Sequence, residues 1–151
     1  ERVVDLYAGA GLFTVGCARA VGPTGSVKAV ERSARACADA LRNCAEFGQV
    51  EVIRSEVTGP LVAEQVGRPD LVVLDPSRQG AGPAVMRAFT ALRPPPRALA
   101  YVSCDPASLA RDLRSLLDAR WSIASLRAFD LFPMTAHVEL VGILTPPSGP
   151  A

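Results

Sequence analysis

The sequence is poor in the residues that bind metal ions. It has one histidine, His137, and four cysteines, Cys17, Cys37, Cys44 and Cys104, which form no Cys-x-x-Cys pair. Zinc and iron–sulfur sites need clusters of such ligands, so we expect no metal site. No apolar run approaches the roughly 20 residues of a membrane span, and the first residues lack the features of a signal peptide. Scattered thiols in such a chain are typical of the reducing cytoplasm.

The size and charge of the chain fit one globular domain. It has 151 residues, a net charge of +1 and no internal repeat. A balanced charge of this kind neither demands nor excludes a nucleic-acid partner. We expect one domain over residues 1–145 and a disordered, proline-rich tail over 146–151. Because the chain starts abruptly on a strand, we expect it to be a fragment of a longer protein.

Short apolar runs alternate with segments of helical spacing along the chain. This alternation predicts an α/β fold with a doubly wound sheet. The last two runs follow one another without a helix, which indicates an antiparallel pair at the end. The predicted strands are Val3–Leu6, Val27–Val30, Val50–Arg54, Leu71–Leu74, Ala98–Val102, Trp121–Phe129 and Val138–Leu144, and the predicted helices are Leu12–Val21, Ser33 through about Phe47, Gly59–Val66, Pro83–Leu92 and Ala107–Ala119.

A glycine-rich turn follows the first strand. Gly9 and Gly11 let the backbone turn tightly and approach a ligand closely. Thr14 replaces the third glycine of the dinucleotide fingerprint, which disfavours pyrophosphate binding. Glu31 ends the second strand, where an acid can accept both hydroxyls of a ribose. The pattern favours a nucleoside ligand over a simple turn with a capping acid, and S-adenosylmethionine and NAD both carry that ribose.

The fourth strand ends in Asp75-Pro76-Ser77-Arg78. Strand ends in an open α/β sheet face the ligand crevice, so Asp75 is expected beside the cofactor and the reacting atoms. Many methyltransferases hold the target base with such a loop, whereas a dehydrogenase has no particular need of it. The alternative is a turn that only faces solvent.

Cys104 and Glu139 are the candidate reacting groups. Cys104 ends the fifth strand, although a buried free thiol is often only a packing residue. Glu139 lies in an apolar strand, where a carboxylate is costly unless it is solvated, paired or functional. Near a methyl donor, a thiolate can add to carbon 6 of uracil, which makes carbon 5 nucleophilic. A base must then remove the proton from carbon 5, so the pair fits covalent catalysis with a general base.

Four motifs carry a resemblance that covers the chain from Asp5 to Leu144. The chain resembles the catalytic domain of the TrmA/RumA-like RNA uracil-5 methyltransferases, and the last two motifs are specific to that family. They are Asp-Leu-Tyr-x-Gly-x-Gly from Asp5, Asp-Pro-x-Arg-x-Gly from Asp75, Ser-Cys-x-Pro from Ser103, and Phe-Asp-x-Phe-Pro-x-Thr-x-His-x-Glu from Phe129.

The resemblance implies a Rossmann-like class I methyltransferase fold, a mostly parallel seven-stranded sheet with an antiparallel C-terminal strand. It implies S-adenosyl-L-methionine as the cofactor and a uridine of tRNA or rRNA, flipped out of its stack, as the substrate. Cys104 would be the nucleophile and Glu139 the proton acceptor. The residues it places at the cofactor are Tyr7, Leu12, Glu31 and Asp75, and those it places near the base are Asp75, Arg78, His137 and the loop 129–133.

Two loops depart from the family pattern. Ser77 stands where proline is usual, and Asp105 puts a negative charge next to Cys104 in place of asparagine. The upstream segment of the family, which adds cofactor and RNA contacts and in some members an iron–sulfur cluster, is not in this sequence.

Other interpretations stay open. Arg111, Arg114 and Arg127 are candidates for phosphate contacts, but a solvated helix face explains Arg111 and Arg114 better. An amino-methyltransferase would use the Asp75 loop and leave Cys104 structural. A non-catalytic cofactor- or RNA-binding module and, last, a nicotinamide dehydrogenase are the remaining alternatives.

Overall fold

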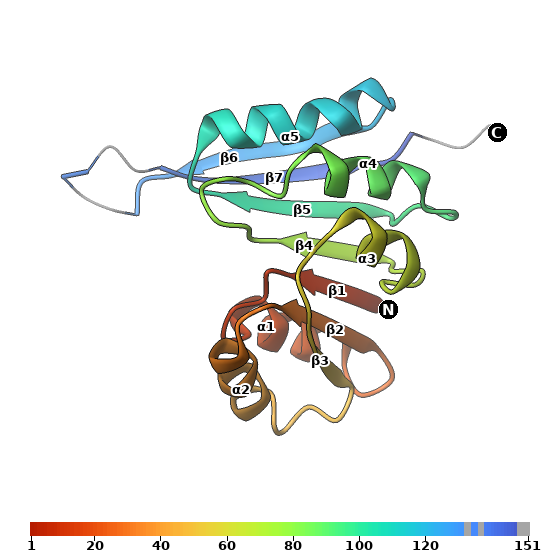
Figure 1. The fold of residues 1–151 in the computed structure, drawn as a ribbon, viewed down its shortest axis with the longest axis vertical. Helices are drawn as coiled ribbons and strands as arrows, with labels where there is room; N and C mark the ends of the chain where they lie inside the picture. The colour runs from red at the N-terminus through yellow and green to blue at the C-terminus, as the bar shows by residue number, and fades with distance from the viewer. Residues whose placement is uncertain (132–133, 136–137, 148–151) are drawn as a thin grey trace.

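The computed structural model describes residues 1–131, 134–135 and 138–147. They form a seven-stranded sheet of order β3-β2-β1-β4-β5-β7-β6, in which only β7 runs antiparallel to its neighbours (Figure 1). This confirms the predicted mostly parallel sheet with an antiparallel C-terminal strand. The strands are β1 Arg2–Leu6, β2 Ser26–Glu31, β3 Val50–Arg54, β4 Leu71–Leu74, β5 Ala98–Ser103, β6 Ser122–Phe129 and β7 Glu139–Thr145.

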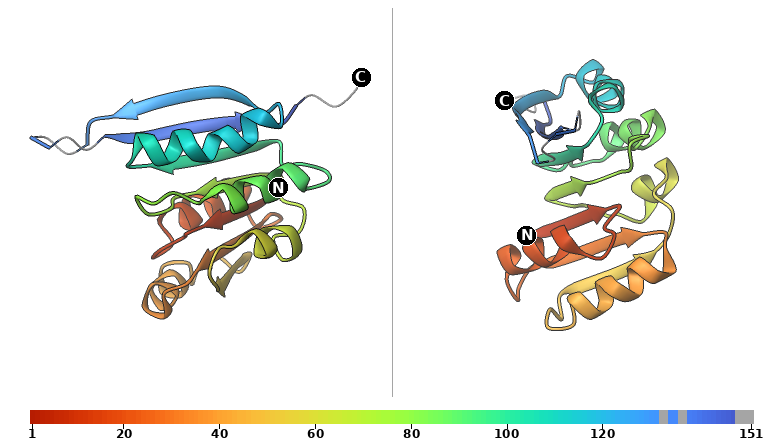
Figure 2. Two further views of the ribbon diagram at one scale, coloured as in Figure 1. Left: turned by 45° about the horizontal axis from the view of Figure 1, so that its top comes forward. Right: turned by 90° about the vertical axis from the view of Figure 1, so that its left-hand side faces the viewer.

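Helices cover both faces of the sheet (Figure 2). One face carries α1, and α2 packs against α1 and β3. The other face carries α3, α4 and α5, which bury the larger of the two apolar clusters. None of the described helices is long and apolar enough to cross a membrane. The helices are α1 Leu12–Val21, α2 Ala34–Asn43, α3 Gly59–Glu64, α4 Pro83–Ala91 and α5 Pro106–Asp118.

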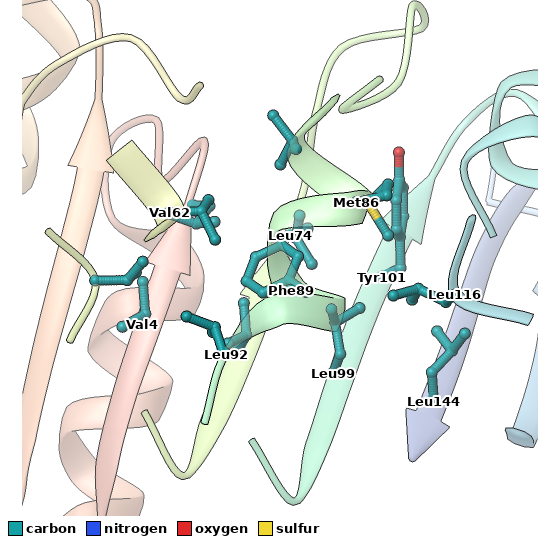
Figure 3. Packing of buried hydrophobic residues seen from close by; sticks show 14 of the residues in the cluster. Val4, Val62, Leu74, Met86, Phe89, Leu92, Leu99, Tyr101, Leu116 and Leu144 are labelled. Atoms are coloured by element: carbon teal, nitrogen blue, oxygen red, sulfur yellow. The ribbon is translucent and has the colours of Figure 1, made fainter. Parts of the chain in front are cut away.

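Side chains alternate between the two faces along the central strands. Leu74, Leu99 and Tyr101 point toward α4 and α5, where they pack with Met86 and Phe89 (Figure 3). The intervening residues of the same strands therefore point to the α1 face, because successive strand residues alternate. This alternation decides which side chains meet at the end of the sheet.

The helix boundaries differ from the sequence prediction mainly at α2. The chain leaves the helix after Asn43 and turns over residues 44–46, whereas the helix was predicted to run to about Phe47. Phe47 packs in the smaller apolar cluster, together with Val50 and Val21. Leaving the helix early lets Phe47 reach that cluster. Of the predicted tail, residues 148–151 lie outside the described residues.

Candidate active site

The predicted site residues gather at one edge of the sheet. The carboxyl ends of β1, β2, β4 and β5 lie at this edge because these strands are parallel. β7 runs the opposite way, so its first residue, Glu139, lies there too (Figure 1). The order of strands reverses between β1 and β4, the position at which open α/β sheets bind ligands.

The glycine-rich turn after β1 has an unusual backbone. Tyr7, Gly9 and Gly11 all have positive φ, of 63°, 53° and 89°. A Cβ on Gly11 would lie 3.4 Å from Cα of Ala40, so this glycine lets α2 approach closely. A Cβ on Gly9 would meet nothing within 4 Å, so the turn is open to a ligand at that residue.

Glu31 joins this turn to the start of α2. Its Oε2 accepts a hydrogen bond of 3.1 Å from the Gly9 N–H, and its Oε1 accepts one of 2.7 Å from the Ser33 N–H. A carboxylate oxygen can accept more than one hydrogen bond. Glu31 is therefore fixed in place and still able to accept the hydroxyls of a ribose.

A cavity of about 350 Å³ lies beside Glu31. Three of the predicted cofactor residues line it, whereas Gly9, Gly11 and Leu12 do not; Leu12, the first residue of α1, is 80% exposed. Residues just after β3 also line the cavity and were not predicted, although they follow a strand end like the others. The lining residues are Tyr7, Glu31, Arg32, Ser55, Glu56, Val57, Asp75, Ser77, Gln79, Gly80 and Ala81.

Asp75 lies within electrostatic reach of two other carboxyl groups, those of Asp5 and Glu139. Burial raises the pKa of Asp5 to about 6, a hydrogen bond of 2.5 Å from the Thr14 hydroxyl opposes the rise, and the charge of Asp75 adds to it. Loss of solvent raises the pKa of Asp75, and the charge of Glu139 raises it further. Oδ1 of Asp5 is buried without a hydrogen-bond partner among the described residues. This concentration of acids favours a cationic ligand.

Thr14 explains the missing third glycine of the fingerprint. Its hydroxyl donates to the fully buried Asp5 carboxylate, so the residue supports the first strand from within α1. A glycine there would remove the hydroxyl that donates to Asp5.

Cys104 and Glu139 lie at the neighbouring ends of β5 and β7. In the antiparallel pair β5–β7, Val102 is opposite Val141 and Ser103 is opposite Leu140. Cys104 follows Ser103 and Glu139 precedes Leu140, so both residues lie next to this last pair of the ladder. Both residues are partly exposed, so the thiol and the carboxylate are accessible from the same side.

The face on which this pair lies is the α1 face. Ala100, four residues before Cys104, packs against the cluster under α1. Asp5 points to that side too, since it bonds to Thr14 of α1. Asp75 lies within electrostatic range of both Asp5, on β1, and Glu139, on β7.

The remaining candidates are placed differently. His137 lies outside the described residues, and Arg78 is exposed in the loop after β4. Arg111 is not a free phosphate ligand, because its guanidinium donates to Asp112 and to the Gln79 carbonyl. Across the part of the chain that the structure describes, no cluster of histidine, cysteine and acidic residues could hold a metal ion.

Asp105 and Asp112 have structural roles that the sequence did not predict. Asp105 caps α5, since its carboxylate accepts a 2.6 Å hydrogen bond from the Ser108 N–H, and this bond lowers its pKa. Asp112 lies among the apolar positions of α5, which include Leu109, Leu113 and Leu116. A single acid on an apolar helix face is the signal by which it could have been found.

Relatives by sequence cover nearly the whole chain. A protein of Streptomyces coelicolor named as an uncharacterized RNA methyltransferase is 44% identical over 146 residues, which is 97% of this chain and 31% of the relative. A Thermotoga maritima protein with the same description is 39% identical over 139 residues, 92% of this chain and 31% of its own. The chain thus spans about a third of the length of these curated relatives.

Solved structures share the fold at low sequence identity. An S-adenosylmethionine-dependent O-methyltransferase of Thermotoga maritima matches with a TM-score of 0.73 at 20% identity, over 100% of this chain and 61% of its own. TrmN of Thermus thermophilus matches with a TM-score of 0.72 at 18% identity, over 96% and 43%. The fold is that of the class I methyltransferases. The model of the tRNA (uracil-5-)-methyltransferase family matches residues 1–146, and the chain belongs to that family.

Proposed function

We propose that this domain is the catalytic part of an RNA (uracil-5-)-methyltransferase that acts on a uridine of tRNA or rRNA. The observation that carries the proposal is the pairing of β5 with β7: Ser103 pairs with Leu140, so Cys104 and Glu139 flank the last pair at the ligand-binding edge. A thiol and a carboxylate on one face, with Asp75 close by, are the groups that carbon-5 methylation of uracil requires.

The family and the fold indicate S-adenosyl-L-methionine as the methyl donor, and the residues present fit it. Glu31 has acceptor capacity for the two ribose hydroxyls, and the turn at Gly9 is open to a ligand. Asp75, coupled to Asp5 and Glu139, makes the site favourable for a cation. When bound, the cofactor supplies an electrophilic methyl group on a positively charged sulfur.

The two reacting residues divide the chemistry between them. The Cys104 thiolate forms a bond to carbon 6 of the uracil, and the electrons of the carbon 5–carbon 6 double bond move toward the carbon 4 carbonyl. Carbon 5 is then nucleophilic and takes up the methyl group. Glu139 accepts the proton from carbon 5, the double bond forms again, and the bond from carbon 6 to sulfur breaks to release the thiolate.

The other residues act on binding. Asp75 and Arg78, in the loop after β4, and His137, outside the described residues, are proposed to contact the base. A paired or stacked uridine must be flipped out to reach Cys104. We propose that the parts of the longer relatives that this chain does not match supply further RNA contacts, and that the protein works in the cytoplasm, as its scattered free thiols predict.

A covalent adduct is the direct test. The full-length parent protein is incubated with S-adenosyl-L-methionine and tRNA or rRNA fragments that contain 5-fluorouridine. Fluorine cannot leave as a proton, so the reaction stalls with RNA bonded to Cys104, and the adduct survives a denaturing gel. Cys104→Ala should abolish the adduct, whereas Cys17→Ala, at a thiol that packs against the apolar cluster under α1, should retain it.

A second arm tests Glu139 with ordinary uridine. Glu139→Gln should form the thioether bond and transfer the methyl group but fail to remove the proton, so the methylated adduct accumulates without fluorine. If neither arm gives an adduct while cofactor binding is intact, the uracil-5 mechanism is wrong. An amino-methyltransferase or a non-catalytic cofactor- or RNA-binding module would then be the better explanation.

A further inference from the structure

A buried carboxylate lies behind the cavity. Asp112 of α5 is 0% exposed, among the apolar residues that pack α5 against the sheet. Removing an ionised carboxylate from water is costly unless it is paired and hydrogen-bonded. The partners of Asp112 therefore show what the residue does in the fold.

Those partners belong to the loop between β4 and α4. Oδ2 of Asp112 accepts hydrogen bonds from the backbone N–H groups of Ala81, at 2.7 Å, and Gly82, at 3.1 Å. It also accepts one of 2.6 Å from the Tyr101 hydroxyl, and burial and this bond raise the pKa of Tyr101, which keeps the hydroxyl protonated. Asp112 thus holds the end of the loop that begins at Asp75.

Arg111 completes this attachment. Its Nε and Nη2 donate to Oδ1 of Asp112 at 3.0 and 2.8 Å, and Nη2 also donates to the Gln79 carbonyl at 2.6 Å. Gly80 packs against Arg111 and Asp112. A Cβ at this residue would collide with Oδ2 of Asp112 and lie 2.7 Å from Nη2 of Arg111. The loop therefore fits against α5 only with glycine at this position.

The attached part of the loop is a wall of the cavity. Gln79, Gly80 and Ala81 all line it, on the same loop as Asp75. The helix that holds this wall begins at Pro106, two residues after Cys104. One helix thus fixes both the position of the thiol and the shape of the cavity.

We propose that Arg111 and Asp112 are positioning residues that hold the cofactor-binding wall at a fixed distance from Cys104. The inference rests on the proposed function for the identity of the ligand in the cavity, S-adenosyl-L-methionine. Arg111 acts here through the loop and not on RNA phosphates, since its guanidinium is committed to Asp112 and Gln79.

The test compares two arginines of one helix in the full-length protein. Arg111→Ala removes the attachment, and Arg114→Ala is the matched control, an exposed arginine of α5 for which the described residues provide no ion pair. S-adenosyl-L-methionine binding is measured by calorimetry, and RNA binding is measured at several salt concentrations. KM and kcat are measured for each substrate. Because the hydrogen bonds from Arg111 that hold the loop are lost, Arg111→Ala should weaken cofactor binding about tenfold.

The expected pattern is specific to positioning. Arg111→Ala should raise the KM for the cofactor and leave RNA affinity and its salt dependence unchanged. Arg111→Lys should recover part of the lost cofactor affinity. Arg114→Ala should behave like the parent. Unchanged cofactor affinity, or a weaker and less salt-dependent binding of RNA, would overturn the inference. Cofactor binding is read without methylation, so the outcome is independent of the fluorouridine test.

A second variant keeps the test informative if Arg111→Ala does not fold. Tyr101→Phe removes one hydroxyl that donates to Asp112 and accepts from the Ala81 N–H at 2.9 Å, and it preserves the packed ring. It should also weaken cofactor binding. Normal affinity in this variant would show that the attachment does not shape the cavity.

Discussion

Asp5 should make the stability of the domain depend on pH. Its carboxyl group is fully buried, with one oxygen bonded to Thr14 and the other without a partner among the described residues. Its pKa rises from 3.8 to about 6 on folding. Between these values the folded chain holds a proton that the unfolded chain has released, so stability falls as the pH rises.

The magnitude follows from the shift. A change of one pKa unit corresponds to about 1.4 kcal/mol, so a shift of this size corresponds to roughly 3 kcal/mol. This stability is fully present below about pH 4 and is lost as the pH rises through about 6. Asp5→Asn removes the ionisation and keeps an oxygen that can accept from Thr14. The variant should lack this part of the pH dependence.

The assay is urea unfolding at pH values from 4 to 7. Trp121 is buried and is the one tryptophan of the chain, so its fluorescence reports unfolding. The free energy of unfolding of the parent, minus that of Asp5→Asn, should fall by about 3 kcal/mol across this range. In Thr14→Val the Asp5 carboxyl group loses the hydroxyl donor that lowers its pKa in the parent, so the fall in stability should extend to higher pH. Parallel curves for parent and Asp5→Asn would refute the reasoning.

Three further predictions concern the loop, the cofactor and the RNA. Gly80→Ala should cost about 1–3 kcal/mol in the free energy of unfolding because its Cβ would collide with α5, whereas Gly67→Ala, with a similar φ and open space around it, should cost less. Asp75→Asn should weaken binding of S-adenosyl-L-methionine. Calorimetry should show that the affinity of the parent for the cofactor falls on acidification and that the affinity of the variant falls less. Equal pH profiles would contradict this prediction. Phe129→Ala should weaken RNA binding because Phe129 is opposite Glu139. Leu126→Ala is the control and should not weaken it, because Leu126 is opposite Gly142 and points to the other face. Equal losses of RNA affinity in a titration would contradict this prediction.

The sheet could be predicted from the sequence because its central strands are buried on both faces. Such strands are continuous apolar runs, as in Leu71–Leu74. They are separated by segments in which apolar residues recur with helical spacing. Cys104 and Glu139 could be proposed as a reacting pair from the sequence, since a carboxylate in the apolar strand at Glu139 needs an explanation. Their positions at neighbouring strand ends depend on the register of β5 with β7, which no local pattern contains.

Polar residues with buried partners could not be predicted in the same way. Thr14 was interpreted only as a missing glycine and Arg111 as part of a solvated helix face. Each has a partner distant in the sequence or on another element: Thr14 donates to Asp5, and Arg111 donates to the Gln79 carbonyl. Hydrogen bonds of this kind depend on the three-dimensional packing, so composition and spacing do not reveal them.

The reversed direction of β7 is what allows a thiol and a carboxylate from distant segments to meet. In a parallel strand, only a residue at the carboxyl end can lie at the ligand edge, and Glu139 begins its strand. Since β7 is antiparallel to β5, its first residue, Glu139, lies at the same edge as Cys104, the residue that follows β5. A shift of one residue in this pairing would turn Glu139 to the α5 face, away from Cys104. The register of β5 with β7 is therefore as necessary to the proposed chemistry as the two side chains themselves.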